Sequence, residues 1–229
     1  SIDFDLPESQ IILNEDGIPV DVQRQERTPA HMLVEDLLIA TNEGVANWAI
    51  EQGIPVLYRI HEYPNDASLE TLRLVATEFG HSLPARKAKP RDFQRLIDSV
   101  KGRPEQAVIS VQVLRSLSRA RYSRSNEGHF GLASSAYVHF TSPIRRYPDL
   151  VVHRQLSRWL KEPRSARSVD LEWLDATAQQ ASSQEQIATE AARNSVDLKK
   201  VEFIEQHLGD HFTGTISGVT PFGFFVRLD

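Results

Sequence analysis

The sequence contains no cysteine among its 229 residues. Disulfides, zinc sites with thiolate ligands, iron–sulfur clusters and thiol nucleophiles are therefore excluded. No apolar run approaches the roughly 20 residues that span a bilayer, and the N-terminal residues 1–5 lack the basic and apolar regions of a secretion signal. We therefore expect a cytoplasmic protein with no membrane partner. The chain does not begin with Met, which indicates a piece of a longer protein.

Several signatures of hydrolases and nucleotide-binding enzymes are absent as well. The sequence has no His-Glu-x-x-His, no Gly-x-Ser-x-Gly and no phosphate-binding loop of the Walker type. What is present is an ordinary globular composition, with 40% apolar and 25% charged residues. This composition excludes disordered and fibrous classes, and the length suffices for one large domain or two small ones.

The formal net charge of −5 hides an uneven distribution. Residues 111–167 carry eleven basic and three acidic side chains, a net +8, and the other residues carry 15 basic and 28 acidic ones, a net −13. Ten of the eleven cations are arginines, whose planar guanidinium favours bidentate contacts with phosphate. A basic segment inside an acidic chain indicates an anionic partner such as nucleic acid, and a solvated basic helix face is the alternative.

Hydrophobic periodicity and turn residues predict a mixture of helices and strands. The turn signal at 14–17 predicts an N-terminal hairpin. Thr28 is a suitable N-cap with Pro29 at the first helical position, and this helix is expected to end at Gly53. The other expected elements are a buried strand at 56–60, a helix capped by Asp66 that ends at Gly80, helices at about 92–100, 105–121 and 148–160, a long helix from about 171 to 208, and a hairpin at 212–228.

The segment 141–147, Thr-Ser-Pro-Ile-Arg-Arg-Tyr, carries the most specific chemistry. Arg145 and Arg146 stand just before an expected helix N-terminus, where an anion also meets the helix dipole. Together with the preceding hydroxyls and the ring of Tyr147, they suit a phosphodiester. The alternative is a pair of arginines tied to acidic side chains within the fold.

Eight histidines suggest a metal site as a further hypothesis. His129, His139, Asp149 and His153 lie close together in sequence, and Asp149 and His153 share a helix face at i, i+4. Such spacing more often marks an Asp–His hydrogen bond that orients a loop. A zinc-dependent hydrolase built on His129, Asp149 and His153 is the least favoured interpretation.

Glu35 and Phe4 are open to two interpretations each. Glu35 lies on or beside an apolar helix face, where a carboxylate is either solvated or directed at a site. Phe4 is either a core anchor or a platform on which a base stacks. Spacing alone does not decide either case.

Several segments, in a fixed order, carry a family signature. They are 3–8 (Asp-Phe-Asp-Leu-Pro-Glu), the helical stretch 31–42, 57–64 (Leu-Tyr-Arg-Ile-His-Glu-Tyr-Pro), 127–133 (Glu-Gly-His-Phe-Gly-Leu-Ala), 137–150 with His153-Arg154, and 197–200 (Asp-Leu-Lys-Lys). Over essentially the whole chain they resemble the ribonuclease II / ribonuclease R family of 3′→5′ exoribonucleases, the RNB domain proteins. The tail resembles the opening strands of the OB-fold RNA-binding domain that follows the catalytic domain in this family.

The resemblance implies a fold class, a domain organisation and an activity. The fold is expected to be α+β, with residues 1–208 as the C-terminal portion of an RNB catalytic domain and residues 209–229 as the first strands of a truncated OB-fold β-barrel. The activity implied is processive, Mg²⁺-dependent hydrolysis of single-stranded RNA from its 3′ end to nucleoside 5′-monophosphates, by a monomeric bacterial enzyme.

Site residues follow from the matched motifs. The resemblance implies that Arg145 clamps the scissile phosphate and that Glu35 lies at the 3′-terminal nucleotide, and these are the two predicted catalytic residues. The predicted RNA-binding residues are Phe4, Arg146, Tyr147 and His129 around the same channel, with Phe222 and Phe224 as stacking aromatics in the tail.

Two departures from the family pattern stand out. The family's metal ligands form an Asp-x₅-Asp-x-Asp-Asp cluster upstream of the matched segments, and this chain does not contain that pattern. We therefore expect no metal site in this chain, Mg²⁺ ligands in the missing N-terminal half of the catalytic domain, and no activity of the isolated chain. The family's Ala-Glu-Arg-Asp reads Ala-Ala-Arg-Asn at 191–194, so Ala192 replaces a glutamate. The alternative function is a non-catalytic RNA-binding protein with a degenerate RNB domain.

Overall fold

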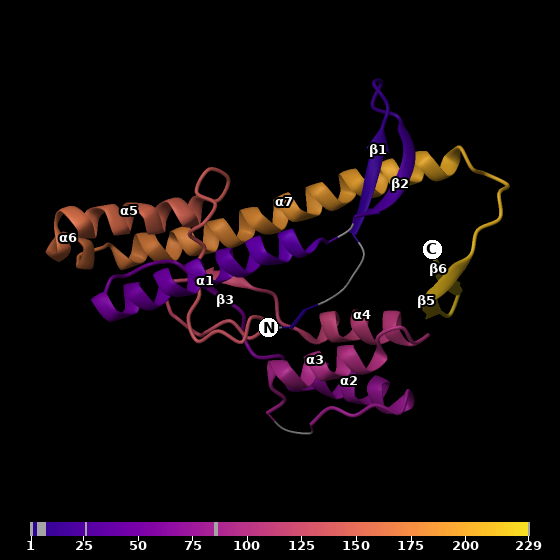
Figure 1. Ribbon diagram of the computed structural model, residues 1–229, viewed down its shortest axis with the longest axis horizontal. Coiled ribbons are helices and arrows are strands. Elements are labelled where there is room, and N and C mark those ends of the chain that lie inside the picture. The colour runs from indigo at the N-terminus through magenta and orange to yellow at the C-terminus, as the bar shows by residue number, and fades with distance from the viewer. Residues whose placement is uncertain (1, 4–7, 26, 85–86, 229) are drawn as a thin grey trace. The chain divides into compact units, whose positions relative to one another are not determined.

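The computed structural model describes residues 2–3, 8–25, 27–84 and 87–228. The chain folds into two compact units, one of Ser1–Asp5 with Arg27–Ala188 and one of Leu6–Glu26 with Thr189–Asp229. Helices and two-stranded sheets are mixed along the chain, which confirms the predicted α+β class (Figure 1). No helix in the described part of the chain is long and apolar enough to cross a membrane.

The first unit holds most of the helices. Its elements are α1 (Pro29–Gln52), β3 (Tyr58–Ile60), α2 (Asp66–Glu78), α3 (Pro90–Val100), α4 (Gln106–Ser116), β4 (Arg121–Ser123), α5 (Tyr147–Lys161), α6 (Pro163–Arg167) and the first part of α7 (Leu171–Glu205). The long helix α7 is confirmed, and it continues into the second unit.

Local sequence signals determine both ends of α1. The Thr28 side chain accepts the His31 backbone N–H, and the His31 ring accepts the Thr28 N–H in return, which forms a capping box. Pro29 occupies the first turn, and Gly53 ends the helix in the left-handed conformation, with φ of 64°. Both boundaries were predicted from the sequence.

Other boundaries differ from the prediction. Asn65, and not Asp66, caps α2, because its side chain accepts the Ser68 N–H at 2.8 Å. The helix expected over 105–121 ends at Ser116, since residues 121–123 form β4 and pair antiparallel with β3. A strand whose partner lies some sixty residues away leaves no local signal in the sequence, and the short helix α6 was not predicted either.

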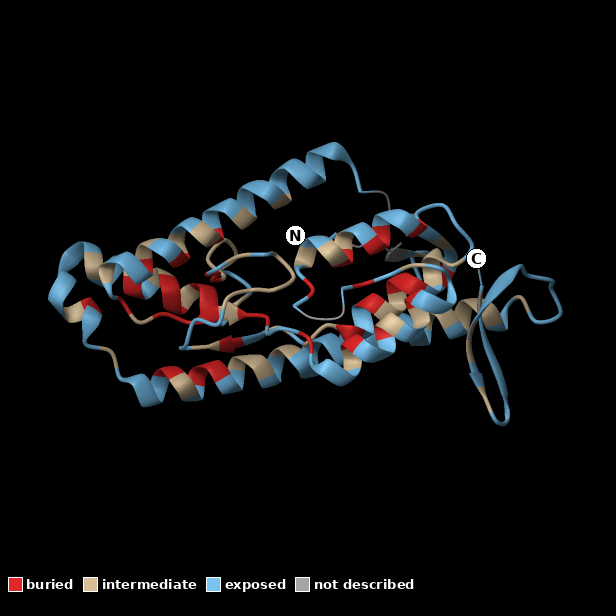
Figure 2. Ribbon diagram, turned by 90° about the horizontal axis from the view of Figure 1, so that it is seen from below, coloured by how far each residue is buried: buried red, intermediate tan, exposed pale blue. Residues whose placement is uncertain are grey.

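Three clusters of buried side chains form the core of the first unit. One lies among α2, α3 and α4, with Leu72, Phe93 and Ile109 fully buried. The second joins the end of α1 to β3, residues 136–138 and α5, and the third joins Leu57 and β4 to α5 and α7. Buried residues run in stripes along the helices and exposed residues cover the other sides (Figure 2).

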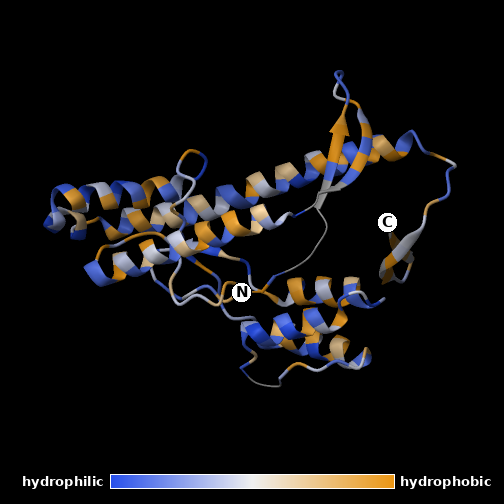
Figure 3. Cartoon of the chain, viewed as in Figure 1, coloured by the Kyte–Doolittle hydropathy of each residue, from blue (hydrophilic) through white to orange (hydrophobic). Residues whose placement is uncertain are grey.

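The second unit contains the two predicted hairpins. Strands β1 (Glu8–Leu13) and β2 (Pro19–Gln25) pair antiparallel around the turn at 14–17, and both carry apolar residues (Figure 3). Lys199, on the last part of α7, donates from Nζ to the Gly17 carbonyl at 2.7 Å. Strands β5 (Gly214–Thr220) and β6 (Gly223–Leu228) form the second hairpin, and its assignment to an OB-fold stays a prediction.

Two glycines of the first unit are expected to respond to alanine with opposite signs. Gly44 lies exposed within α1, and a Cβ there meets nothing within 4 Å. We expect Gly44→Ala to raise the free energy of unfolding by about 0.5–1 kcal/mol, because alanine loses less backbone entropy in a helix. At Gly131 a Cβ lies 2.8 Å from His61 Nδ1, so Gly131→Ala should lower it. Denaturant unfolding of the full-length protein measures the free energy of unfolding of both variants. Changes of equal sign would contradict the different surroundings described for the two glycines.

Candidate functional site

The predicted phosphate-binding segment forms a turn that leads directly into α5. The backbone N–H groups of Arg145 and Arg146 both donate to the Ser142 carbonyl, at 3.3 and 3.1 Å. Helix α5 begins at Tyr147, with a proline in its first turn. Proline suits this position because the first helical N–H groups have no partner within the helix. The motif therefore stands at a helix N-terminus, as predicted.

Asp149 lies in the first turn of α5 and is fully buried. Its Oδ1 accepts two hydrogen bonds at 2.8 Å each, one from the Ser142 backbone N–H and one from Arg146 Nη2. A carboxylate in the first turn is also favoured by the helix dipole. Asp149 thus ties the start of the turn to the start of the helix.

The two adjacent arginines have different surroundings. Arg146 is paired with Asp149, and 21% of its side chain is exposed. Arg145 is exposed and forms no ion pair with the residues that the structure describes. The interpretation of an arginine paired with an acid of the fold therefore applies to Arg146. Arg145 has no such partner among the described residues and is available to a phosphate.

Tyr147 presents its ring in the same turn of chain. It is 48% exposed, and the guanidinium carbon of Arg154 lies 5.8 Å from its ring centroid, in a cation–π arrangement. Protein surfaces that bind single-stranded nucleic acids combine these two kinds of group, an exposed aromatic ring and a positive charge.

A set of histidine and tyrosine rings, here called the His–Tyr cluster, connects β3 and β4 with the segment 129–139. Its rings meet edge to face, with successive centroids 5.0–5.9 Å apart. The cluster consists of His61, His129, Tyr137, His139 and Tyr122. Hydrogen bonds fix it, since the Tyr122 hydroxyl lies 2.8 Å from His139 Nδ1 and Asn42 donates to the Tyr137 hydroxyl at 2.9 Å.

Burial keeps the imidazoles of this cluster uncharged. It lowers the pKa of His129 to about 3, with further contributions from His61 and Arg59. Burial likewise lowers the pKa of His139 to about 3, and the nearby positive charges of Arg146, Arg59 and Arg145 add to the effect. His139 therefore lies within electrostatic reach of both arginines of the motif.

His129 was predicted to bind RNA, and it lines a concavity of about 620 Å³ together with Tyr63, Lys89 and Asn126. Its Nδ1 accepts the Leu132 backbone N–H at 3.2 Å. The neutral ring therefore offers one further nitrogen and an aromatic face, and no positive charge.

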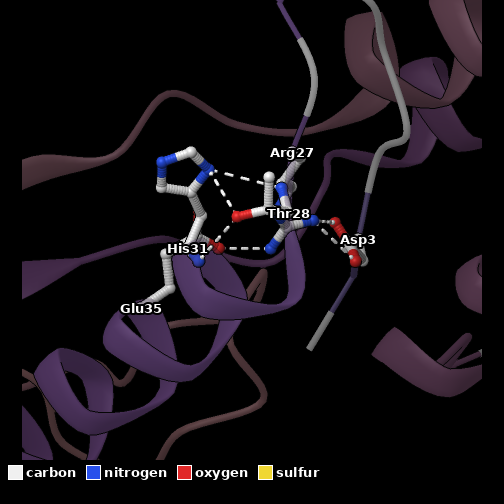
Figure 4. Close-up of polar contacts among 5 residues, drawn as sticks. All are labelled: Asp3, Arg27, Thr28, His31 and Glu35. Carbon is white, nitrogen blue, oxygen red and sulfur yellow. Dashed lines mark hydrogen bonds and ion pairs between the residues drawn. The ribbon is translucent and has the colours of Figure 1, made fainter.

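Glu35 lies on α1, one turn beyond the capping box. Its Oε2 forms an ion pair with Nη2 of Arg27, whose Nη1 donates to Asp3 Oδ1 at 2.7 Å (Figure 4). The Glu35 side chain is 46% exposed, and exposed ion pairs of this kind are weak and readily exchanged for another partner. Asp36, its neighbour, is exposed.

For three other predicted residues the structure gives no position relative to this turn. Phe4 lies outside the described residues. Phe222 and Phe224 belong to the second unit, where they are 84% and 65% exposed. Exposed rings are what stacking requires, but their role in RNA binding stays a prediction.

The residues of the zinc hypothesis are engaged separately. His153 lies with Nε2 2.8 Å from the Phe140 carbonyl and stacks on the Phe140 ring, while Asp149 binds Ser142 and Arg146. No group of three or more His, Asp or Glu side chains suited to a metal ion occurs among the described residues. The expected loop-orienting carboxylate is present, but it acts through Arg146 and Ser142 and not through His153.

Sequence reasoning missed several side chains that surround this site. Arg59 lies over the Tyr122 ring, with its guanidinium carbon 4.7 Å from the centroid, and pairs with Glu185 at 2.5 Å. Asn42 accepts the Phe140 N–H at 3.0 Å and is buried. A buried asparagine on a largely apolar helix face was the one signal available, because such a group needs a hydrogen-bond partner.

The His–Tyr cluster should make the stability of the fold depend on pH. His129 and His139 have a pKa of about 3 in the folded chain and about 6.5 when unfolded. Between these values the unfolded state binds more protons, so the free energy of unfolding falls as pH decreases from about 6.5 towards about 3. We expect His139→Gln to reduce this slope. Denaturant unfolding of the full-length protein and the variant at pH 7 and pH 5 measures this dependence. An unchanged dependence of the free energy of unfolding on pH would contradict a buried, neutral His139.

Comparison of the sequence with known proteins identifies the family of this chain. A family model described as the RNB domain matches residues 1–162. Ribonuclease R of Aquifex aeolicus (strain VF5) is 41% identical over 230 residues, covering 100% of this chain and 33% of that protein. Ribonuclease R of Escherichia coli (strain K12) is 37% identical over 238 residues, covering 100% of this chain and 29% of that protein. The chain thus spans about a third of the length of these relatives.

Solved structures agree with the sequence comparison. Mycoplasma genitalium RNase R in complex with ribose methylated single-stranded RNA has a TM-score of 0.90 and 28% identity, covering 100% of this chain and 37% of that one. The same protein in complex with double-stranded RNA has a TM-score of 0.89 and 27% identity, covering 100% of this chain and 41% of that one. The resemblance inferred from the motifs is therefore confirmed, and the chain belongs to the RNB domain family.

Proposed function

We propose that the full-length protein containing this chain is a bacterial 3′→5′ exoribonuclease, which processively hydrolyses single-stranded RNA to nucleoside 5′-monophosphates. Membership of the RNB domain family and the names of the relatives support this function. The observation that carries the proposal is Arg145, an exposed guanidinium at a helix N-terminus with no ion pair among the described residues. The proposal includes a monomeric, cytoplasmic enzyme.

Arg145 holds the phosphate at the scissile position. Negative charge develops on the phosphate oxygens as water attacks, and a fixed guanidinium stabilises that charge more in the transition state than in the bound substrate. Arg146 leaves a second positive charge close by while it is tied to Asp149. Tyr147 offers its exposed ring to the adjoining nucleotide.

Glu35 contacts the 3′-terminal nucleotide. Arg27 donates a hydrogen bond to Oε2 of this carboxylate, so Oε1 can accept a hydrogen bond from a ribose hydroxyl. Because the pair with Arg27 is exposed, its exchange for a substrate hydroxyl costs little.

The remaining predicted residues bind the RNA along its length. Phe4 stacks on a base, His129 contributes its uncharged ring, and Phe222 and Phe224 stack on nucleotides from the hairpin β5–β6. In this proposal residues 1–208 form part of the catalytic domain, and residues 209–229 supply the first strands of an OB-fold. Aromatic residues of OB-folds bind single strands by stacking.

Mg²⁺ serves the full-length enzyme in this proposal. The described residues contain no group of three metal-ligating side chains, so they do not fit this ion and no step through the metal is derived for them. Its ligands belong to the remainder of the full-length protein.

Release of mononucleotides from RNA tests the function and the metal together. We expect the full-length protein to release nucleoside 5′-monophosphates from a uniformly labelled single-stranded RNA oligonucleotide, to lose this activity in EDTA, and to regain it with excess Mg²⁺. Binding without release at any Mg²⁺ concentration would favour the non-catalytic alternative. Release that persists in EDTA would remove the metal from the proposal.

Substitution of the phosphate-binding arginine tests its role. We expect Arg145→Ala in the full-length protein to lower kcat by about 100-fold to 1,000-fold while KM changes by less than about threefold, since its contact strengthens as charge develops. Steady-state kinetics and a separate RNA-binding assay give both values. The matched control is Arg95→Ala, on α3, whose side chain is 74% exposed. A loss of affinity with kcat unchanged would show that Arg145 only anchors RNA.

A further inference from the structure

Asp149 is the one carboxylate that is buried in the described part of the chain, with none of its surface exposed. A carboxylate in such a place needs a positive partner and hydrogen bonds to remain charged. Arg146 and the Ser142 N–H supply them, both at the same oxygen, Oδ1.

These contacts close the turn from both sides. The Ser142 N–H is held by Asp149, and the Ser142 carbonyl accepts the N–H groups of Arg145 and Arg146. Arg145 lies between the two anchored points, and its own side chain forms no ion pair with the described residues. The position from which its side chain extends therefore depends on the backbone of this turn.

The pair is poorly built as a source of stability. Asp149 Oδ2 and Arg146 Nε are both buried without a hydrogen-bond partner, and such orphaned groups oppose folding. Replacing a buried ion pair by apolar residues of similar volume is often neutral or stabilising. Val151 and Val152 next to it are buried in apolar clusters, so an apolar pair at these positions would suit the surroundings. Stability alone does not account for Asp149.

We propose that Asp149 is a positioning residue, which acts through Arg146 and Ser142 to hold the turn 142–146 so that Arg145 meets the scissile phosphate. This inference rests on the proposed exonuclease function. Arg146 is then an internal strut and not itself a contact to RNA. The competing interpretation, in which Arg146 binds RNA directly, is one of the outcomes of the test.

The central test is a double-mutant cycle in the full-length protein. We expect Asp149→Asn to lower kcat by about tenfold to a hundredfold with KM within a factor of about 3, because displacement of a positioning group by about 1 Å costs this much. In an Arg145→Ala background the same substitution should cost nothing further, since its effect passes through Arg145. Independent, multiplying losses in the double variant would overturn the proposal.

Arg146 supplies a second set of variants. Arg146→Gln should reproduce the kcat loss of Asp149→Asn, and the two together should be no worse than either alone. The observed contact to Asp149 uses one nitrogen, so Arg146→Lys should restore most of the activity. A rise in KM for Arg146→Gln that Asp149→Asn does not share would show that Arg146 binds RNA directly, and would overturn its role as a strut.

Matched controls remove the general effects of charge and folding. Arg95→Gln breaks an Arg–Asp pair with the same i, i+3 spacing on α3, and Asp175→Asn breaks the exposed pair with Arg124. Both should leave kcat within a factor of about 2, because each removes an ion pair outside the turn 142–146 and pairs with an exposed arginine contribute little. A loss in these controls equal to that of Asp149→Asn would overturn the assignment.

Hydrogen exchange separates the failure of this inference from that of the proposed function. In Asp149→Asn the amides of Ser142, Arg145 and Arg146 should exchange faster, while those of α2–α4 stay protected. Unchanged exchange at the turn would overturn the positioning role, whatever the activity. If the wild-type protein releases no nucleotide but the turn loosens as expected, the proposed function fails and the structural link between Asp149 and the turn stands. If Asp149→Asn does not fold, the Arg146 variants carry the same test.

Discussion

The functional motif depends on the burial of one negative charge. Asp149 has no exposed surface, and a carboxylate in that position is tolerated only where a cation and hydrogen-bond donors meet it. It lies in the first turn of α5, where the helix dipole adds to the favourable field. The turn, the helix start and Arg146 are therefore coupled through one oxygen atom, and Arg145 takes its place from them.

As a consequence, the two adjacent arginines, Arg145 and Arg146, have different surroundings. Arg146 is largely buried and committed to Asp149, whereas Arg145 is exposed and uncommitted among the described residues. Residue type and position present them as equivalent, since both precede the same helix, and only the family resemblance assigns them different roles. What distinguishes them is the direction each side chain takes from the turn. The strut fixes the backbone from which the Arg145 side chain extends, because the Arg145 N–H and its neighbour are held at Ser142.

Nearby residues predicted most helices and hairpins, whereas the elements that the prediction missed depend on contacts between distant parts of the chain. Thr28, Pro29 and Gly53 determine α1 from within a few residues, and the turn at 14–17 determines the hairpin β1–β2. The strand β4 was missed because its partner β3 lies some sixty residues away. The family motif located Arg145 and Tyr147 correctly at a helix start, but nothing local shows that Arg146 would fold back onto Asp149. Asn42 and Tyr122 join the site through contacts across the core, so periodicity placed Asn42 only in a helix and placed Tyr122 in no element.

The His–Tyr cluster constrains what chemistry the motif can carry. His129 and His139 have a pKa of about 3, so near neutral pH neither carries the second, acidic proton of an imidazolium and neither adds a positive charge. Their contribution is packing and hydrogen bonding, as in the contact of His139 with Tyr122. The positive charge at the site is then carried by arginines, which stay protonated in proteins. The positive charge that these side chains present therefore stays constant between mildly acidic and mildly alkaline pH.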